Sequence, residues 1–195
     1  MNDAAPGSAA SGSAAPGSSA SEGAVHEVVA RLVAYEEIRQ LASRYAIATD
    51  RRDIDSLASL FIDDVRVGRE TYGRDALRAN LREQLRAIGV SILNVGTHQI
   101  DLIDADHATG HVYCKGEIQD RERWIHQAIR YDDTYERRDG TWLFVRRRHL
   151  LFYGAEVGVN PLTLAPANWP EHHDGLGSIP YSDPTWKAFW DLTPD

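Results

Sequence analysis

Apolar residues recur at steps of three and four along residues 25–46, which is typical of a helix with one apolar face. The series predicts a first helix of about six turns. Asp53 is placed to cap a second, shorter helix, because a polar cap followed by an apolar series marks a helix start. Gly73 interrupts the chain before a third helix, which is predicted over residues 75–87. The apolar series of the first helix comprises Val28, Leu32, Tyr35, Ile38, Leu41, Ala42, Tyr45 and Ala46.

From residue 91 to about residue 153 apolar residues alternate with polar ones, so the pattern changes from a helical to a strand-like period. The segments 104–106 (Asp-Ala-Asp) and 138–140 (Arg-Asp-Gly) are turn signals between long strands. Helices followed by antiparallel strands predict an α+β fold, in which the helices pack on one face of a curved sheet.

The two ends of the chain differ from this middle part in composition. Residues 1–23 are mainly Ala, Gly, Ser and Pro and are predicted to form a disordered tail, because they cannot bury enough apolar surface to offset their ordering entropy. The folded domain is predicted over residues 24–153. Residues 154–195 are rich in Pro, Trp, His and Gly and are predicted to form a wrapping arm that ends in a short helix around residues 184–192. Three tryptophans are expected to pack this arm, namely Trp169, Trp186 and Trp190.

Alternation within the strands assigns side chains to two faces of the sheet. In the strand that begins at residue 91, the even-numbered positions are predicted to be covered, including Ile92, Asn94 and His98. The opposite face of the sheet is predicted to be exposed and carries Tyr113 and Trp124 among charged residues. In the last strand the covered positions are predicted to be Val145, Arg147, His149 and Leu151.

The covered face is therefore predicted to be a concave apolar surface with polar groups scattered over it. Burying that many polar groups costs free energy unless they pair with one another or contact a ligand. A few convergent polar groups in an apolar cavity are typical of a small-molecule site, so the expected partner is a hydrophobic small-molecule ligand. The predicted lining comprises Tyr45, Asn94, His98, Gln127, Tyr131, Arg147 and His149.

Three polar residues each allow two interpretations. Asp50 lies where the first apolar series ends. It is either a solvated helix-end carboxylate paired with a neighbouring arginine, or a pocket base whose pKa is raised by burial. His98 is either a hydrogen-bonded core histidine or a group that delivers a proton. Arg147 either stabilises a developing anion or forms a buried ion pair with Asp133.

Composition and charge narrow the classes of function. The chain has 195 residues, a hydrophobic fraction of 43% and a net charge of −8, which together indicate one globular domain and argue against nucleic-acid binding. The single cysteine, Cys114, excludes an intrachain disulfide, and we expect a cytoplasmic location. No apolar run approaches the roughly 20 residues that span a membrane, and no signal peptide is recognisable. His107 and His111 lie on a turn and a strand, so no metal site is expected.

Three stretches of the chain resemble a known family. They read EEIRQLASRYAIATDRRDIDSLASLFIDDVRV, YGRDALR and YDDTYERRDGTWLFVRRR, and the similarity covers roughly residues 25–153. They look like a SnoaL-like domain of the nuclear transport factor 2-like superfamily, which includes scytalone dehydratase, hexachlorocyclohexane dehydrochlorinase and polyketide cyclases. The resemblance implies a cone-shaped α+β barrel, in which a curved antiparallel sheet and three N-terminal helices enclose a pocket. It also implies a homodimer and no cofactor.

The resemblance assigns roles to several residues. In this family an Asp at the end of the first helix works with a His on the sheet, and Asp50 falls on the Asp position. The His position falls on Leu93 or Asn94, so His98 or His149 would have to supply the imidazole. The pocket arginine of the dehydrochlorinase and a polar binding residue of scytalone dehydratase correspond to Arg147 and Tyr131.

The resulting functional prediction is a cofactor-independent lyase or isomerase of the dehydratase or cyclase type, acting on an alicyclic or polycyclic substrate. Asp50 is the implied general base and His98 its catalytic partner. Two alternatives remain: a non-catalytic ligand-binding or interaction module of the same fold, and a protein like the small subunit of a dioxygenase. The implied substrate-binding residues are Tyr45, Asn94, Gln127, Tyr131, Arg147 and His149.

Overall fold

The structure is a computed structural model that describes residues 18–168, 171 and 174–192. The chain divides into two compact units, of which the first ends at Ala34 and the second comprises residues 35–195. The elements, in order, are α1 (Ser18–Asp50), α2 (Ile54–Ser59), α3 (Arg74–Arg86), β1 (Ser91–Leu102), β2 (His107–Asp120), β3 (Arg123–Arg138), β4 (Thr141–Glu156), the 3₁₀ turn η1 (Pro161–Thr163) and α4 (Pro184–Asp191).

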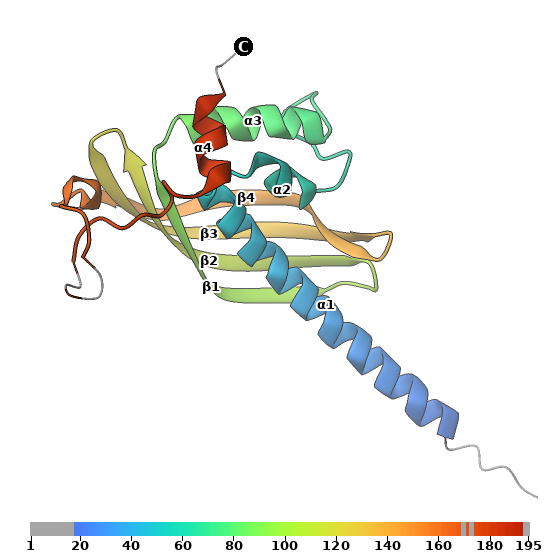
Figure 1. The fold of residues 1–195 in the computed structure, drawn as a ribbon. Coiled ribbons are helices and arrows are strands. Elements are labelled where there is room, and N and C mark those ends of the chain that lie inside the picture. The colour runs from blue at the N-terminus through green and yellow to red at the C-terminus, as the bar shows by residue number, and fades with distance from the viewer. Residues whose placement is uncertain (1–17, 169–170, 172–173, 193–195) are drawn as a thin grey trace, which may run out of the picture. The chain divides into compact units, whose positions relative to one another are not determined.

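The second unit contains one antiparallel sheet of four strands in the order β1-β2-β3-β4, so each strand pairs with its neighbour in the sequence (Figure 1). The part of α1 that belongs to this unit packs on the sheet through Ala42, which is completely buried. The predicted α+β fold with a curved antiparallel sheet is confirmed. Among the residues that the structure describes, no helix is long and apolar enough to cross a membrane.

Local sequence signals explain where the short helices begin. The Asp53 carboxylate accepts a hydrogen bond of 3.0 Å from the backbone N–H of Ser56 and so caps α2, as its sequence context predicts. Gly73 precedes α3 with a φ of +97°, a backbone conformation that residues other than glycine seldom adopt. The buried side chains of α3 recur every four residues and are Leu77, Leu81 and Leu85.

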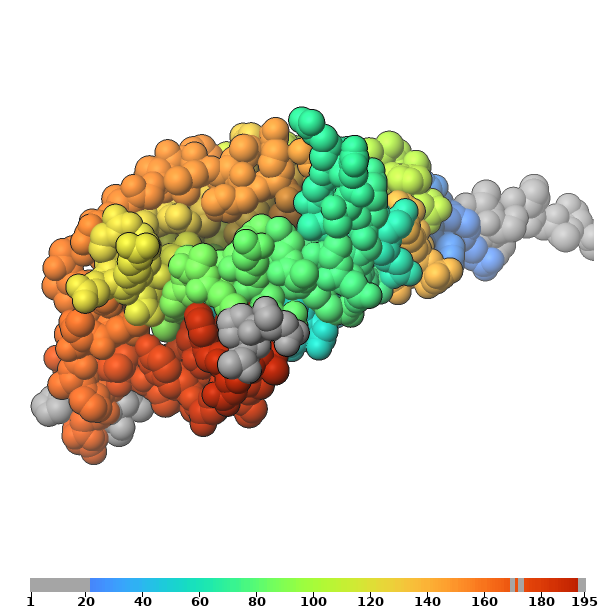
Figure 2. All heavy atoms as spheres, turned by 90° about the horizontal axis from the view of Figure 1, so that it is seen from above, coloured from blue at the N-terminus to red at the C-terminus, as the bar shows by residue number. Residues whose placement is uncertain are grey.

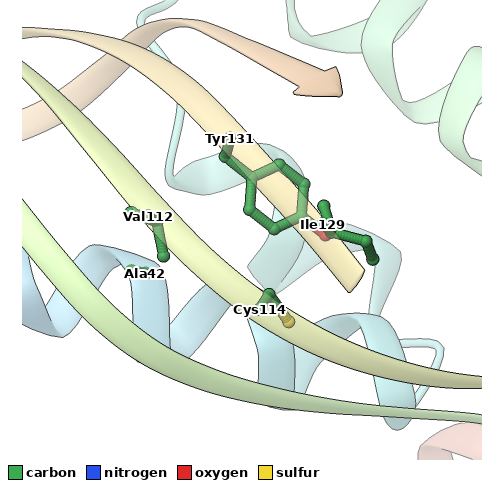
Figure 3. Packing of buried hydrophobic residues seen from close by; sticks show 5 residues of the cluster. All are labelled: Ala42, Val112, Cys114, Ile129 and Tyr131. Carbon is green, nitrogen blue, oxygen red and sulfur yellow. The ribbon is translucent and has the colours of Figure 1, made fainter. Parts of the chain in front are cut away.

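The core against which the site is built lies between α1 and the middle of the sheet. Figure 3 shows its buried side chains gathered on one face of β2 and β3. Leu93, Val95 and Tyr45 are partly buried and pack against it. The cluster consists of Ala42, Val112, Cys114, Ile129 and Tyr131.

A β-bulge in β1 corrects part of the predicted covered face. The pairing with β2 shifts by one residue between Val95 and His98, so the alternation of side chains changes phase there. Before the bulge, Leu93 and Val95 pack against the core while Ile92 and Asn94 are exposed, which is the reverse of the prediction. After the bulge, His98 lies on the covered side, as predicted.

Two further irregularities correct β4. Between Thr134 and Tyr135 of β3 the pairing skips Val145, so Phe144 is buried and Val145 only partly so, contrary to the prediction. Arg147 faces the interior, as predicted. Leu151 is exposed, so its predicted burial is also wrong, and a second shift between Ala128 and Ile129 makes the pairing skip Phe152.

The ends of the chain differ from the predicted boundaries in one respect. Helix α1 begins at Ser18, inside the segment that was expected to be disordered, and residues 1–17 lie outside the described residues. Helix α4 occupies the position predicted for a short helix, and it lies beside α3 (Figure 2). Trp186 is buried, Trp190 is 40% exposed, and Trp169 lies outside the described residues.

The uncovered face of the sheet carries an aromatic patch, which we define as Tyr113, Phe152 and Tyr153. The rings of Tyr113 and Phe152 meet edge to face at 5.4 Å, although these side chains are 47% and 59% exposed. Lys115 donates a hydrogen bond of 3.2 Å to the Tyr153 hydroxyl. Trp124, which was expected on this exposed surface, is instead buried. Exposed aromatic groups that lie together are a common feature of protein interfaces.

We propose that the aromatic patch pairs two copies of the chain. Sedimentation equilibrium at micromolar concentration should then return twice the chain mass of 21.8 kDa. The double substitution Tyr113→Ser and Phe152→Ser should return the single-chain mass, because it removes the apolar area that the contact would bury. Ile103→Ser, which alters an exposed apolar residue away from the patch, is the matched control and should leave the dimer intact. A monomeric wild-type protein would contradict the proposal.

Candidate active site

Asp50 is the last residue of α1, and its carboxylate points at the start of β1. Oδ1 accepts a hydrogen bond of 2.9 Å from the Ser91 hydroxyl, and Oδ2 accepts one of 2.9 Å from the backbone N–H of Leu93. The neighbouring Arg51 forms an ion pair of 2.8 Å with Asp183 instead. Asp50 is therefore not a solvated helix-end carboxylate paired with Arg51; it is attached to the edge strand of the sheet.

Burial raises the pKa of Asp50 to about 6. The hydrogen bonds from Leu93 and Ser91, and the positive charge of Arg52, act in the opposite direction but do not cancel the effect of burial. An ionised carboxylate has about four acceptor positions, and these two hydrogen bonds occupy only two of them. The carboxylate can therefore still accept a proton from a bound molecule.

A second cluster of polar groups lies deeper in the sheet and centres on Asp133. Arg147 binds this carboxylate with both arms of its guanidinium, Nε to Oδ1 at 2.9 Å and Nη2 to Oδ2 at 2.7 Å. The side chains of Arg147 and Asp133 are only 3% and 0% exposed. The sequence left open whether Arg147 forms this ion pair, and the structure shows that it does.

His98 belongs to this second cluster. The Tyr135 hydroxyl donates its hydrogen to Asp133 at 2.8 Å, so its oxygen accepts from Nε2 of His98 at 3.1 Å. Nδ1 of His98 is then the unprotonated nitrogen, and no described residue donates a hydrogen bond to it. Burial lowers the pKa of His98 to about 4, so the imidazole is neutral at pH 7. His98 is thus bonded to Tyr135 and not to Asp50.

Aromatic rings surround the Arg147 guanidinium. Its central carbon lies 4.4, 4.3 and 4.4 Å from the ring centres of Tyr45, Tyr131 and Phe144. Such contacts stabilise a cation that has been removed from water. Nη1 of Arg147 is buried, and no described residue accepts a hydrogen bond from it. This N–H group is therefore a buried donor without an acceptor among the described residues.

Cys114 connects the two clusters. Its thiol interacts electrostatically with both Arg147 and Asp50, so it lies within range of each. Burial raises the pKa of the thiol to about 11, which keeps it neutral and makes it part of the apolar wall. Asp50, through its contact with Leu93, and Arg147, through its contact with Tyr131, thus border the same hydrophobic core.

The other predicted binding residues have different surroundings. The rings of Tyr45 and Tyr131 meet at 5.9 Å, and the His149 ring lies 5.5 Å from Tyr131, so these three belong with Arg147. His149 is exposed, so its predicted place on the covered face is wrong, although the partial burial of its ring lowers its pKa. Gln127 lines a separate cleft of about 390 Å³ near the β2–β3 turn. Asn94 is exposed, so its predicted place in the pocket lining is wrong, because the bulge in β1 reverses its direction.

Several residues that build the site carried no strong signal in the sequence. Ser91 lies at the first position of its strand, and nothing around it indicates a hydrogen bond to a residue 41 positions away. Arg52 follows another arginine and looks like a solvated side chain, yet it is buried. Tyr135 could have been found, because it continues the inward series that contains Tyr131 and Asp133.

Comparison with known proteins places these features in a family. The model of the SnoaL-like domain matches residues 30–148. The γ-hexachlorocyclohexane dehydrochlorinase of Sphingobium indicum is 31% identical over 124 residues, which cover 60% of this chain and 80% of that protein. The crystal structure of a type 2 hexachlorocyclohexane dehydrochlorinase (LinA) superposes with a TM-score of 0.61 at 26% identity and covers 72% of this chain and 98% of that one.

A more distant structure agrees with the same fold. A Novosphingobium aromaticivorans protein assigned as a scytalone dehydratase superposes with a TM-score of 0.58 at 21% identity, covering 68% of this chain and 93% of that one. At that identity the likeness concerns the fold alone. The chain belongs to the SnoaL-like domain family and has the cone-shaped α+β fold of the nuclear transport factor 2-like superfamily.

Proposed function

We propose that the protein is a cofactor-independent lyase or isomerase that acts on an alicyclic or polycyclic small molecule, with Asp50 as the general base. The observation that carries this proposal is the Asp50 carboxylate, which is partly buried beside an apolar core, has a raised pKa and keeps free acceptor positions. The 31% identity to a γ-hexachlorocyclohexane dehydrochlorinase supports an elimination reaction.

In an elimination, Asp50 would take a proton from a carbon atom of the substrate. The electron pair of that C–H bond would form the new double bond, and the leaving group would depart from the neighbouring carbon with its own bonding electrons. A carboxylate with a pKa of about 6 is mostly ionised at pH 7, yet it is a stronger base than an exposed carboxylate. Burial thus makes the Asp50 carboxylate a stronger base while leaving most of it ionised at pH 7.

The departing group or an enolate oxygen needs a donor on the opposite side of the substrate. The free Nη1–H of Arg147 is suited to this task, because a donor fixed in a buried site stabilises developing negative charge without reorganising. Tyr45 and Tyr131 would contact the apolar part of the substrate, since their rings already flank the guanidinium. Both sets of groups border the core that contains Cys114.

One observation favours a second function. His98 is bonded to Tyr135, so the Asp–His pair that the resemblance implies is absent as a direct contact between Asp50 and His98. A protein of this fold without that pair can bind a hydrophobic ligand without converting it. The two functions differ in one measurable respect: only the enzyme loses product formation, rather than ligand binding, when Asp50 is neutralised.

Replacing Asp50 tests the proposed base directly. Asp50→Asn keeps the shape of the side chain but removes the proton acceptor, so activity should fall by a factor on the order of 10² to 10⁴. Chloride release from γ-hexachlorocyclohexane and water loss from hydroxylated bicyclic ketones are suitable first assays. Asp55→Asn, at a side chain that is 86% exposed, is the matched control and should retain full activity. Equal turnover by the two variants would rule out Asp50 as the base.

The pH dependence of stability follows from the raised pKa of Asp50. Between about pH 4 and pH 6 the folded protein binds a proton at Asp50 that the unfolded chain does not, so this residue makes stability decrease as pH rises. Asp50→Asn should therefore gain stability relative to wild type across this window, by on the order of 2 kcal/mol at pH 7. Urea denaturation from pH 4 to pH 8 measures the difference. A difference that stays constant with pH would show that the pKa of Asp50 is not raised.

A further inference from the structure

Arg52 is an unusual residue for the turn that follows α1. Its side chain is one of the largest that are fully buried, at 1% exposure, and burying a charge requires specific partners. Its backbone has a φ of +59°, in the left-handed region that residues other than glycine seldom occupy. Such a conformation persists only where the surrounding contacts enforce it. The partners of Arg52 therefore identify what this turn is built to hold.

The guanidinium of Arg52 joins three segments. Nη1 donates to the backbone oxygen of Thr49 at 2.6 Å and to the Ser91 hydroxyl at 2.8 Å, and Nη2 donates to the backbone oxygen of Gly89. Its central carbon also lies 4.8 Å from the ring centre of Trp186, in a cation–π contact. Trp186 belongs to α4, beyond the residues that the family model matches.

Ser91 connects Arg52 to the carboxylate of Asp50. The Ser91 hydroxyl has a single hydrogen, which it donates to Asp50 at 2.9 Å. Because the N–H of Arg52 approaches the oxygen of this hydroxyl, the hydrogen is directed away from Arg52 and toward Asp50. A continuous chain of contacts thus runs from Trp186 through Arg52 and Ser91 to Asp50.

Other contacts, which do not involve Arg52, also hold helix α4 in place. Asp183, which caps α4, accepts from the N–H of Thr185 at 2.8 Å and forms the ion pair with Arg51. At the other end of the helix, Arg86 of α3 donates to the backbone oxygen of Phe189 at 3.3 Å. The Trp186 ring is buried in a cluster with Val90 and Trp124.

We propose that the C-terminal arm is part of the active site, with Trp186 holding Arg52 and Arg52 positioning Asp50 through Ser91. Arg52 is in this view a positioning residue, since it contacts Ser91 and not the substrate. The role of Asp50 as a base rests on the proposed function, whereas the chain of contacts does not depend on it.

The groups around Asp50 determine whether loss of Arg52 raises or lowers the pKa of its carboxyl group. Arg52 lies on the turn after α1 and is the cation that lowers the pKa of Asp50. From β1 the carboxylate receives the hydrogen bonds of Ser91 and Leu93, and from β2 it faces the neutral thiol of Cys114. Loss of Arg52 would leave burial opposed by the hydrogen bonds alone. The pKa of Asp50 should then rise.

The test is an NMR titration of the Asp50 carboxyl carbon in the full chain. We expect Arg52→Met and Ser91→Ala each to raise the pKa of Asp50 by about one unit, and Arg52→Lys to restore part of the shift. Trp186→Leu should raise it by a smaller amount. Arg44→Met, which removes an exposed arginine from α1, and Lys187→Met, which removes an exposed lysine from α4, are the matched controls and should leave it unchanged.

The outcomes separate this proposal from the proposed function. If Arg52→Met does not fold, Ser91→Ala and Trp186→Leu decide the question, since neither removes a buried charge. An unchanged Asp50 pKa in folded Trp186→Leu would show that the arm is only structural and would overturn the proposal. Where activity is measured, a one-unit rise predicts about fivefold lower activity at pH 6. Shifted pKa values in a protein without turnover would support the contact chain and count against the enzyme.

Discussion

The hydrogen bonds between Asp50 and the start of β1 form the contact on which the site depends. They attach the end of α1 to the edge strand of the sheet, and they remove the carboxylate from water at the same time. The raised pKa is a consequence of this attachment, because a group that anchors a helix end to a sheet must be partly buried. The Asp50 side chain therefore both anchors the end of α1 to the sheet and carries the raised pKa. Asp50→Asn removes the buried charge and keeps one of the two oxygens that accept these hydrogen bonds.

The buried ion pair of Arg147 and Asp133 needs further partners to offset the cost of removing both charges from water. Two charges removed from water cost more free energy than their attraction returns unless the remaining hydrogen-bonding groups are also satisfied. Here Tyr135 and His98 extend the network on the carboxylate side, and aromatic rings cover the cation. Truncating one partner of a buried pair typically costs about 3–5 kcal/mol. The two hydrogen bonds to Asp133 hold the Arg147 guanidinium, and with it the unpaired Nη1–H, in one orientation.

Periodicity was sufficient to predict the helices, the antiparallel sheet and the inward position of Arg147, because these follow from local alternation of apolar and polar residues. The resemblance added the position of Asp50. The direction of Asn94 was not predictable, because an extra residue in a strand leaves no compositional trace. The burial of Arg52 was not predictable either, because it depends on Ser91, 39 positions away, and on Trp186 in a helix near the C-terminus.

The bulge in β1 has a consequence for how this strand is compared with related sequences. It divides the strand into two parts with opposite alternation of side chains. Odd-numbered residues face inward before the bulge, and even-numbered residues face inward after it. Asn94 and His98 are four residues apart, an even spacing that would keep them on one face of a regular strand, yet they lie on opposite faces. Leu93 and His98 are five residues apart and would lie on opposite faces of a regular strand, whereas the extra residue at the bulge lets both face the covered side. Side chains in this strand are therefore equivalent between relatives only if the position of the bulge is also shared.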